Sequence, residues 1–395
     1  MFGWCDKCHT VTIEGLCAEH GATRPLEHVN AVDVHPLSIF EKSLFNERMH
    51  DLKLGNGFFI IYSDRTFRKK VITLDVPIAE VKLVKNELMV TPLTSGEIKG
   101  IQKSDFISAN SNRLDRLITT TKGFVEWELD KAKNAIVSFS GGKDSIVIGD
   151  ILADYGIPKV FIDTRLEFPE TYDFIKSAGN GKPIDIARAE SSFFSLCKQK
   201  GFPKHGYRWC CKTQKFEPFR RYLDEKYGTD QVSVFTGERR WEGLYRIQQP
   251  FKKTHKHIPT QQTIQPILDW YALDVWNYIW SKDIPWNRVY DNFDRAGCWL
   301  CPFGLEYRVH LLQFTHPKLY NALEKFGGVS KRASRKSTVM EDEKPCTMEL
   351  DGEMVKTCDV YGHFFVNGTC FRCGEKGAST IEAPSLTSIA HKIGV

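Results

Sequence analysis

The chain of 395 residues contains no run of about 18 apolar residues, so the sequence predicts no transmembrane helix. Its first residues also lack a basic segment followed by an apolar core, the pattern of a secretory signal. We therefore expect a cytosolic protein, whose 12 cysteines serve as metal ligands or redox groups rather than as disulfides. Neither sign of charge dominates. The net charge of +5 suits a polyanionic small molecule and also permits RNA.

The sequence lacks the Gly-x4-Gly-Lys-Ser/Thr pattern of a Walker A loop, but it has a different glycine loop. An apolar run at 135–139 leads into the motif Ser140-Gly141-Gly142-Lys143-Asp144-Ser145. An apolar stretch typical of a helix follows, so the segment predicts a buried strand, a tight loop and a helix N-terminus. The glycines let the backbone approach a ligand, and the free amides at the start of the helix attract phosphate. The motif is identified as the PP-loop signature of the adenine-nucleotide alpha-hydrolase-like superfamily.

Strands and helices alternate from residue 134 to about residue 326. Core strands are expected at 135–137, 159–162 and 231–235, with helical stretches between them. This order predicts an α/β fold of the Rossmann-like, PP-loop kind, with a central parallel sheet and helices on both of its faces. Ligands of such sheets bind at the carboxyl ends of the strands, which are followed here by Ser140, Asp163 and Gly237.

The rest of the chain divides by composition around this central domain at 113–326. Residues 1–28 predict a small zinc ribbon, and residues 29–112 predict a small β-rich domain. Residues 327–345 show no apolar period and predict a linker. Residues 346–395 form a second cysteine-rich ribbon module.

Cysteines and histidines stand at metal-ligand spacing at both ends of the chain. The N-terminal ligands are predicted to be Cys5, Cys8, Cys17 and His20. The C-terminal ligands are predicted to be Cys358, His363, Cys370 and Cys373. Both sets favour structural zinc. In the second set Cys346 could replace His363 as the fourth ligand, and this alternative stays open.

Four further cysteines occur as two close pairs in the central domain. They are Cys210 and Cys211, followed much later by Cys298 and Cys301. Four thiolates in two pairs can hold one 4Fe–4S cluster. A zinc ion with four thiolate ligands fits the same count, but adjacent cysteines are awkward ligands for tetrahedral zinc, so the cluster is preferred.

Together with the PP-loop, these paired cysteines resemble those of the sulfonucleotide reductases, the reductases of adenylylsulfate and phosphoadenylylsulfate. The segment 163–171 resembles the family's Asp-Thr-Gly stretch, which continues to Pro-Glu-Thr, and 236–240 with Arg246 resembles its Gly-x-Arg region that grips the substrate. The resemblance covers about residues 134–305. It implies the same α/β fold, a nucleotide substrate and a 4Fe–4S cluster.

The activity that the resemblance implies is reduction of phosphoadenylylsulfate to sulfite and adenosine 3′,5′-bisphosphate, as in sulfate assimilation. Adenylylsulfate is the alternative substrate. Thioredoxin or a similar dithiol would be the reductant, and a homo-oligomer is expected. Lys143 and Arg239 are predicted to stabilise charge on the leaving phosphate. The predicted substrate-binding residues are Ser140, Gly141, Gly142, Lys143, Asp144, Ser145, Asp163, Glu167, Arg208, Gly237, Arg239, Arg240 and Arg246.

Two departures from the family pattern leave other functions open. The family usually carries an eroded PP-loop, whereas this loop is complete, as in enzymes that use ATP. The family's Glu-Cys-Gly-x-His segment, which holds the catalytic cysteine, is absent. Among the cysteines outside the predicted metal sites, Cys197 and Cys346, the predicted nucleophile is Cys346, because it follows the linker. ATP-dependent thiolation of tRNA and a redox sensor that binds nucleotide or RNA are the alternatives.

Overall fold

The computed structural model describes residues 2–29, 34–63, 69–84, 87–179, 183–203, 207–243, 246–301 and 306–325, with four short strands after residue 346. These late strands are β19 (Thr347–Leu350), β20 (Glu353–Lys356), β21 (Phe365–Val366) and β22 (Thr369–Cys370). The predicted linker at 327–345 and four of the predicted C-terminal residues lie outside the described residues, namely Cys346, Cys358, His363 and Cys373.

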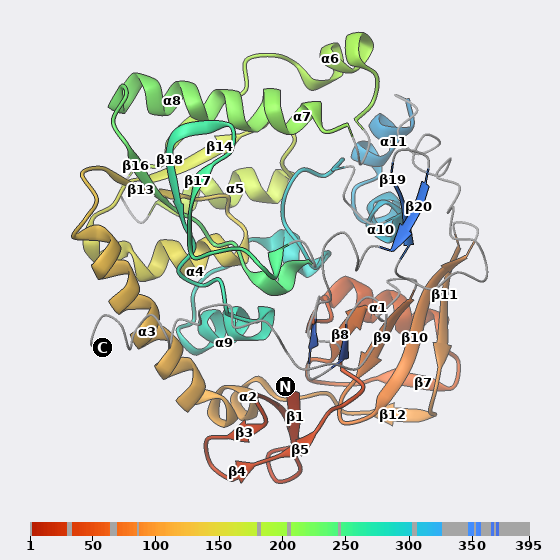
Figure 1. Cartoon of the computed structure of the whole chain (residues 1–395). Helices are drawn as coiled ribbons and strands as arrows, with labels where there is room; N and C mark the ends of the chain where they lie inside the picture. Colours follow the sequence, from red (N-terminus) through yellow and green to blue (C-terminus); the bar gives the residue numbers. More distant parts are fainter. Residues whose placement is uncertain are drawn as a thin grey trace.

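A six-stranded sheet forms the centre of the larger unit, in the order β15-β14-β13-β16-β18-β17 (Figure 1). Its strands are β13 (Ala135–Ser138), β14 (Lys159–Asp163), β15 (Asp185–Arg188), β16 (Val232–Phe235), β17 (Lys252–His255) and β18 (Ile258–Ile264). The strands predicted at 135–137, 159–162 and 231–235 are therefore present as β13, β14 and β16. All neighbours pair in parallel except the edge strand β17, which pairs antiparallel with β18. The sequence did not predict this edge strand, which forms a hairpin with β18.

Helices cover both faces of this sheet. Successive residues of a strand point to opposite sides, so each strand contributes apolar side chains to both faces. Ile136 of β13 packs with Phe219 of α8 on one face, whereas Val137 joins the cluster that contains Ile148 of α4 on the other. The predicted α/β architecture is confirmed. The helices of this unit are α4 (Lys143–Ile151), α5 (Pro169–Ser177), α6 (Phe193–Lys200), α7 (Trp209–Cys211), α8 (Glu217–Tyr227), α9 (Ala272–Ser281), α10 (Glu306–Thr315) and α11 (Pro317–Lys325).

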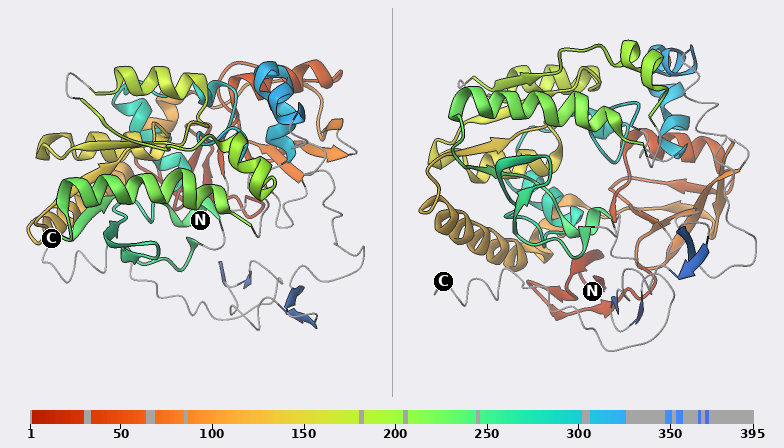
Figure 2. Two further views of the ribbon diagram at one scale, coloured as in Figure 1. Left: turned by 90° about the horizontal axis from the view of Figure 1, so that it is seen from above. Right: turned by 45° about the horizontal axis from the view of Figure 1, so that its top comes forward.

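A β-rich unit lies beside the α/β unit, as the views in Figure 2 show. Its main sheet has the order β11-β10-β9-β8-β6, and all neighbours pair antiparallel. The unit comprises β6 (His35–Pro36), α1 (Ile39–Arg48), β7 (Leu52–Leu54), β8 (Ile60–Ser63), β9 (Lys69–Thr73), β10 (Pro77–Val84), β11 (Glu87–Pro92) and β12 (Gly96–Ile98). A capping box between Ser38 and Glu41 starts α1. The β-rich N-terminal region predicted from the sequence is therefore present.

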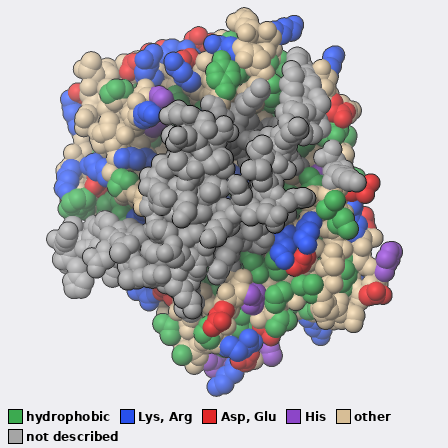
Figure 3. Space-filling model, turned by 45° about the vertical axis from the view of Figure 1, so that its right-hand side comes forward, with side chains coloured by type: hydrophobic (Ala, Val, Ile, Leu, Met, Phe, Trp, Pro, Cys, Tyr) green, Lys and Arg blue, Asp and Glu red, His purple; other side chains and the backbone are tan. Residues whose placement is uncertain are grey.

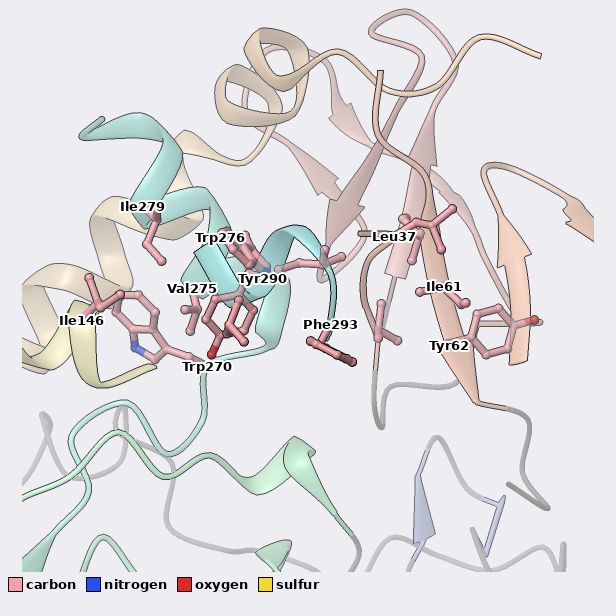
Figure 4. Close-up of a cluster of buried hydrophobic side chains, with 14 of the residues drawn as sticks. Leu37, Ile61, Tyr62, Ile146, Trp270, Val275, Trp276, Ile279, Tyr290 and Phe293 are labelled. Carbon is pink, nitrogen blue, oxygen red and sulfur yellow. The ribbon is translucent and has the colours of Figure 1, made fainter. Parts of the chain in front are cut away.

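One hydrophobic core joins the two units (Figure 4). Leu37 and Ile61 contribute to it from the β-rich unit, and Trp276, Tyr290 and Phe293 contribute from the α/β unit. The small N-terminal module packs below both units in Figure 1. Its strands are β1 (Phe2–Cys5), β2 (Thr10–Ile13), β3 (Leu16–Cys17), β4 (Gly21–Ala22) and β5 (Arg24–Pro25). Among the described helices, none has both the length and the apolar character required to span a membrane.

Helices α2 (Lys103–Ala109) and α3 (Ser111–Leu129) connect these parts. Asn110, between them, accepts the amide of Ile13 at 2.8 Å and so holds the N-terminal module in place. Arg113 of α3 donates from Nε and Nη2 to both carboxylate oxygens of Asp274 at 2.8 Å, and both side chains are buried. Asp274 also accepts the amide of Tyr271 and caps α9. This ion pair thus fixes α3 against the α/β unit.

We predict that Asp274→Ala lowers the free energy of unfolding by about 3–5 kcal/mol, because Arg113 would remain buried without its main counter-charge. The measurement is urea denaturation followed by far-UV circular dichroism. Asp173→Ala is the matched control, since Asp173 and Lys176 form an exposed pair on α5. The control should change stability by less than about 1 kcal/mol. Equal effects of the two substitutions would contradict the importance of the buried pair.

Candidate active site

The PP-loop closes on itself between β13 and α4. Gly141 has a φ of 71°, a left-handed conformation that glycine adopts without strain. The Ser145 hydroxyl accepts the amide of Ser140 at 3.2 Å and donates to the carbonyl of Gly142 at 2.8 Å. These bonds hold the loop in a fixed shape at the N-terminus of α4, where its remaining backbone amides can meet an anion.

A partly buried carboxylate links the PP-loop to the segment that follows β16. Asp144 accepts Lys143 Nζ at 2.8 Å and Arg239 Nε at 2.5 Å. Burial acts to raise the pKa of Asp144, but Arg239 and Lys143 outweigh it and lower that pKa to about 2. The two cations predicted to stabilise a leaving phosphate therefore lie side by side, held by one shared anion.

Gly237 allows this close approach. A Cβ at this position would lie 2.6 Å from the backbone carbonyl carbon of Asp144 and 2.9 Å from the amide of Ser145. Any other residue would therefore push the segment after β16 away from α4. The structure thus brings Gly237 directly against the PP-loop, as expected for two strands whose carboxyl ends share one edge of the sheet.

The two cysteine pairs of the central domain also come together. The Cys210 and Cys211 thiols are hydrogen-bonded, and both Cys298 and Cys301 lie near enough to raise the pKa of Cys210. The amide of Trp299 donates to the carbonyl of Leu166 at 3.0 Å and anchors the second pair beside the loop after β14. The thiol of Cys298 lies 3.5 Å from the Thr164 hydroxyl.

This donor set fits an iron–sulfur cluster. Four thiols from two segments converge, which is the donor set that one 4Fe–4S cluster takes, whereas the four N-terminal ligand atoms all lie within 4.8 Å of one another. A cubane takes each thiolate at a separate iron and so needs wider spacing than one zinc ion.

Glu167 and Lys215 lie beside these thiols. Burial raises the pKa of Glu167 to about 7, while the Thr164 hydroxyl, 2.8 Å away, and the charge of Lys215 oppose that increase. Lys215 also helps to lower the pKa of Cys211 and of Glu238. The sequence analysis did not identify Lys215. It lies in a π-helical turn directly after Cys211, and this type of turn often marks functional sites but has no sequence signature here.

Two predicted substrate residues near the thiols have polar partners within the protein. Asp163 accepts the Arg165 amide and the Tyr172 hydroxyl at 2.8 and 2.9 Å, and Arg188 Nε at 2.8 Å. Arg208 Nη2 lies 3.4 Å from the sulfur of Cys211.

The arginines after Arg239 are also engaged. Arg240 donates to Asp269 at 2.5 Å and to the carbonyl of Ile247 at 2.8 Å, so it holds the turn before β17. Arg246 pairs with Glu242. The structure therefore places Arg239 against the PP-loop, whereas Arg240 bonds to Asp269 and Arg246 shares the Glu242 carboxylate with Arg239. A substrate role for those two residues stays a prediction.

Residues 134–303, which carry the PP-loop and both cysteine pairs, match the family model described as phosphoadenosine phosphosulfate reductase domain. The chain carries a domain of this family. The match covers the whole central sheet and ends just after Cys301.

Several known proteins are similar to part of the chain, and the chain spans about half the length of the first two. Two uncharacterized proteins of Methanocaldococcus jannaschii are 33% identical over 244 residues and 34% identical over 224 residues. The chain spans 58% and 46% of their lengths, and the matches cover 58% and 55% of the chain. Adenosine 5′-phosphosulfate reductase 2 of Bacillus subtilis is 27% identical over 180 residues, which is 42% of this chain and 71% of that protein. The crystal structure of phosphoadenylyl-sulfate reductase from Candida auris is 21% identical, covers 49% of this chain and 98% of its own, and has a TM-score of 0.38.

A separate site at the N-terminus could bind a metal. Nδ1 of His20 lies 3.6 Å from the sulfurs of Cys5 and Cys17 and 3.2 Å from that of Cys8, and the sulfurs of Cys8 and Cys17 are 3.8 Å apart. Tetrahedral zinc with ordinary bond lengths would separate two sulfurs by about 3.8 Å and a sulfur from a nitrogen by about 3.5 Å. The four predicted ligands are thus already arranged for one tetrahedral ion, and zinc remains the predicted ion.

We predict that Cys8→Ala removes about one equivalent of zinc and lowers the melting temperature, because metal binding stabilises such small modules. Elemental analysis and the spectrum of cobalt-substituted protein measure the change. Cys197→Ala removes a thiol outside every predicted metal set and should leave the zinc content unchanged. If Cys8→Ala kept full zinc content, the N-terminal site would not be the one that binds it.

Proposed function

We propose that the protein reduces a sulfonucleotide to sulfite, with phosphoadenylylsulfate as substrate and adenylylsulfate as the alternative. The observation that carries the proposal is the convergence of four paired thiols beside a PP-loop, within a domain of the phosphoadenosine phosphosulfate reductase family. The cytosolic location and homo-oligomer expected from the sequence belong to the same proposal.

The nucleotide would bind with its phosphates against the N-terminus of α4. Lys143 and Arg239 are buried and share the charge of Asp144, so their donors are held in fixed positions before the substrate arrives. Fixed donors stabilise charge on a leaving phosphate without reorganisation during the reaction. Gly237 lets the segment that carries Arg239 approach the loop closely.

The proposed chemistry has two steps. A cysteine thiolate attacks the sulfur of the sulfonucleotide, so that an S–S bond forms to give S-sulfocysteine while the sulfur–oxygen bond to the phosphate breaks and the nucleotide leaves with that electron pair. A dithiol such as thioredoxin then attacks the S-sulfocysteine, releases sulfite and is oxidised to a disulfide. The proposed nucleophile is Cys346, which lies outside the described residues.

Cys210, Cys211, Cys298 and Cys301 would hold a 4Fe–4S cluster. When bound, the cluster would supply a fixed local charge and a structural crosslink between the two cysteine-bearing segments. Around it, Arg208 and Lys215 provide positive charge on the side of Cys211, and Thr164 fixes the position of Cys298.

We predict that oxygen-free protein contains iron and sulfide and releases sulfite from phosphoadenylylsulfate in the presence of reduced thioredoxin. Cys298→Ala should lose both iron and sulfite release, because one of the four proposed ligands is gone. Cys197→Ala should keep both. Failure of the wild-type protein to release sulfite from either sulfonucleotide would refute the proposal.

ATP-dependent sulfur transfer to tRNA is a second candidate, which the complete PP-loop favours. Every position from Ser140 to Ser145 is retained, and Asp144 keeps both of its cationic partners. RNA could also contact the surface, although Lys and Arg side chains are interspersed with Asp and Glu on the described part of the face in Figure 3.

The two candidates separate by their consumption of ATP. A thiolation enzyme is expected to convert ATP to AMP and pyrophosphate when tRNA is present, whereas a reductase is expected to leave ATP unchanged under the same conditions. Chromatography of the nucleotides measures the outcome. Lys143→Met is the control, since any genuine turnover at this loop requires its positive charge.

A further inference from the structure

The hydroxyl of Tyr290 lies at the N-terminus of α4, although its residue comes from a distant part of the chain. It accepts the amide of Lys143 at 2.9 Å. A Cβ on Gly142 would lie 3.3 Å from this hydroxyl and 3.8 Å from the Cβ of Ala296, so the PP-loop, Tyr290 and the segment before Cys298 meet at one point. Tyr290 was not among the residues predicted from the sequence.

The hydroxyl proton of Tyr290 is available for a ligand. Because the oxygen accepts an amide of the loop, the proton must point in another direction. Among the described residues, nothing accepts this proton, although the side chain is 93% buried, with 7% of its surface exposed. A buried hydroxyl without an acceptor is costly unless a ligand supplies one.

The orientation of the phenol is fixed by its surroundings. Its ring packs edge-to-face on Trp276, with a centroid separation of 5.4 Å and an interplanar angle of 90° (Figure 4). The Lys143 ammonium lies 5.7 Å from the ring centroid. Burial raises the pKa of Tyr290, so the group remains a neutral donor at physiological pH.

We propose that Tyr290 is a positioning residue of the nucleotide site, whose hydroxyl donates a hydrogen bond to an anionic phosphate oxygen held at the start of α4. The proposal rests on the PP-loop as the nucleotide site of the proposed function. It extends that function by assigning a donor from outside the loop, on the segment that leads to Cys298. The same hydroxyl would thereby set the distance between the bound phosphate and the second cysteine pair.

The test is Tyr290→Phe, which removes the hydroxyl and keeps the ring against Trp276. Binding of phosphoadenylylsulfate, adenylylsulfate and ATP to oxygen-free protein is measured by isothermal titration calorimetry. Loss of a hydrogen bond to a charged group should raise the dissociation constant by about 10-fold to 150-fold. If the reductase reaction occurs, KM should rise by a similar factor while kcat is largely kept, since the contact exists in the bound substrate.

Tyr278→Phe is the matched control. Its hydroxyl is also buried, but it donates to Asp150 near the other end of α4 at 2.7 Å. Thermal melting of both variants separates loss of stability from loss of binding. The control should bind the nucleotides as wild type does.

Unchanged or tighter nucleotide binding by Tyr290→Phe would overturn the proposal. That result would mean that the hydroxyl only occupies the place of a phosphate, because its removal would free the Lys143 amide to bind the nucleotide. Absence of binding of all three nucleotides to wild type would also overturn it. Failure of the proposed reductase function can be distinguished from failure of the proposal for Tyr290. In that case the wild-type protein would release no sulfite, but Tyr290→Phe would still bind ATP or a sulfonucleotide more weakly than wild type.

Discussion

The pairing of the partly buried Asp144 carboxylate with two buried cations is the interaction on which the candidate site depends. This carboxylate joins Lys143, at the start of α4, to Arg239, which follows β16, and its pKa of about 2 means that it stays ionised at any physiological pH. Two buried cations would repel each other without this anion between them. Gly237 makes the arrangement possible, since its missing Cβ lets the two segments touch. The sheet provides the approximate placement, and this ion triad sets the final distances.

A second, partly buried carboxylate connects the β-rich unit to the cysteine-bearing segment. Burial acts to raise the pKa of Asp294, but Arg308, Lys70 and His35 hold it well below its usual value. Lys70 and His35 come from β9 and β6, whereas Asp294 lies four residues before Cys298. The β-rich unit therefore supports the segment that carries the second cysteine pair, which gives it a structural part in the site whether or not it also binds a partner of its own.

Local patterns in the sequence were sufficient to predict three strands of the central sheet, the PP-loop and the candidate N-terminal metal ligands, because each is marked by residues close together in the chain. The joining of Cys210 and Cys211 with Cys298 was predicted from two close pairs of thiols and supported by a resemblance, since spacing alone gives no contact. Tyr290 and Lys215 could not be predicted in this way. The first reaches the loop from 147 residues away, and the second depends on a π-helical turn. Arg240 was predicted to bind substrate together with its neighbour Arg239, which faces the loop. In the structure Arg240 binds Asp269 and backbone carbonyls.

The turn after β14 holds a residue other than glycine in a left-handed conformation. Arg165 has a φ of 61°, which costs a residue with a Cβ about 1–3 kcal/mol, and the resembling family stretch has glycine there. The turn persists because its amide donates to Asp163, which is itself held by Tyr172 and Arg188. The turn places the Leu166 carbonyl where the Trp299 amide can reach it, and this contact brings Cys298 to the sheet. The local strain is therefore offset by the network that assembles the thiols, and the exposed Arg165 side chain adds a positive charge at the edge of the site.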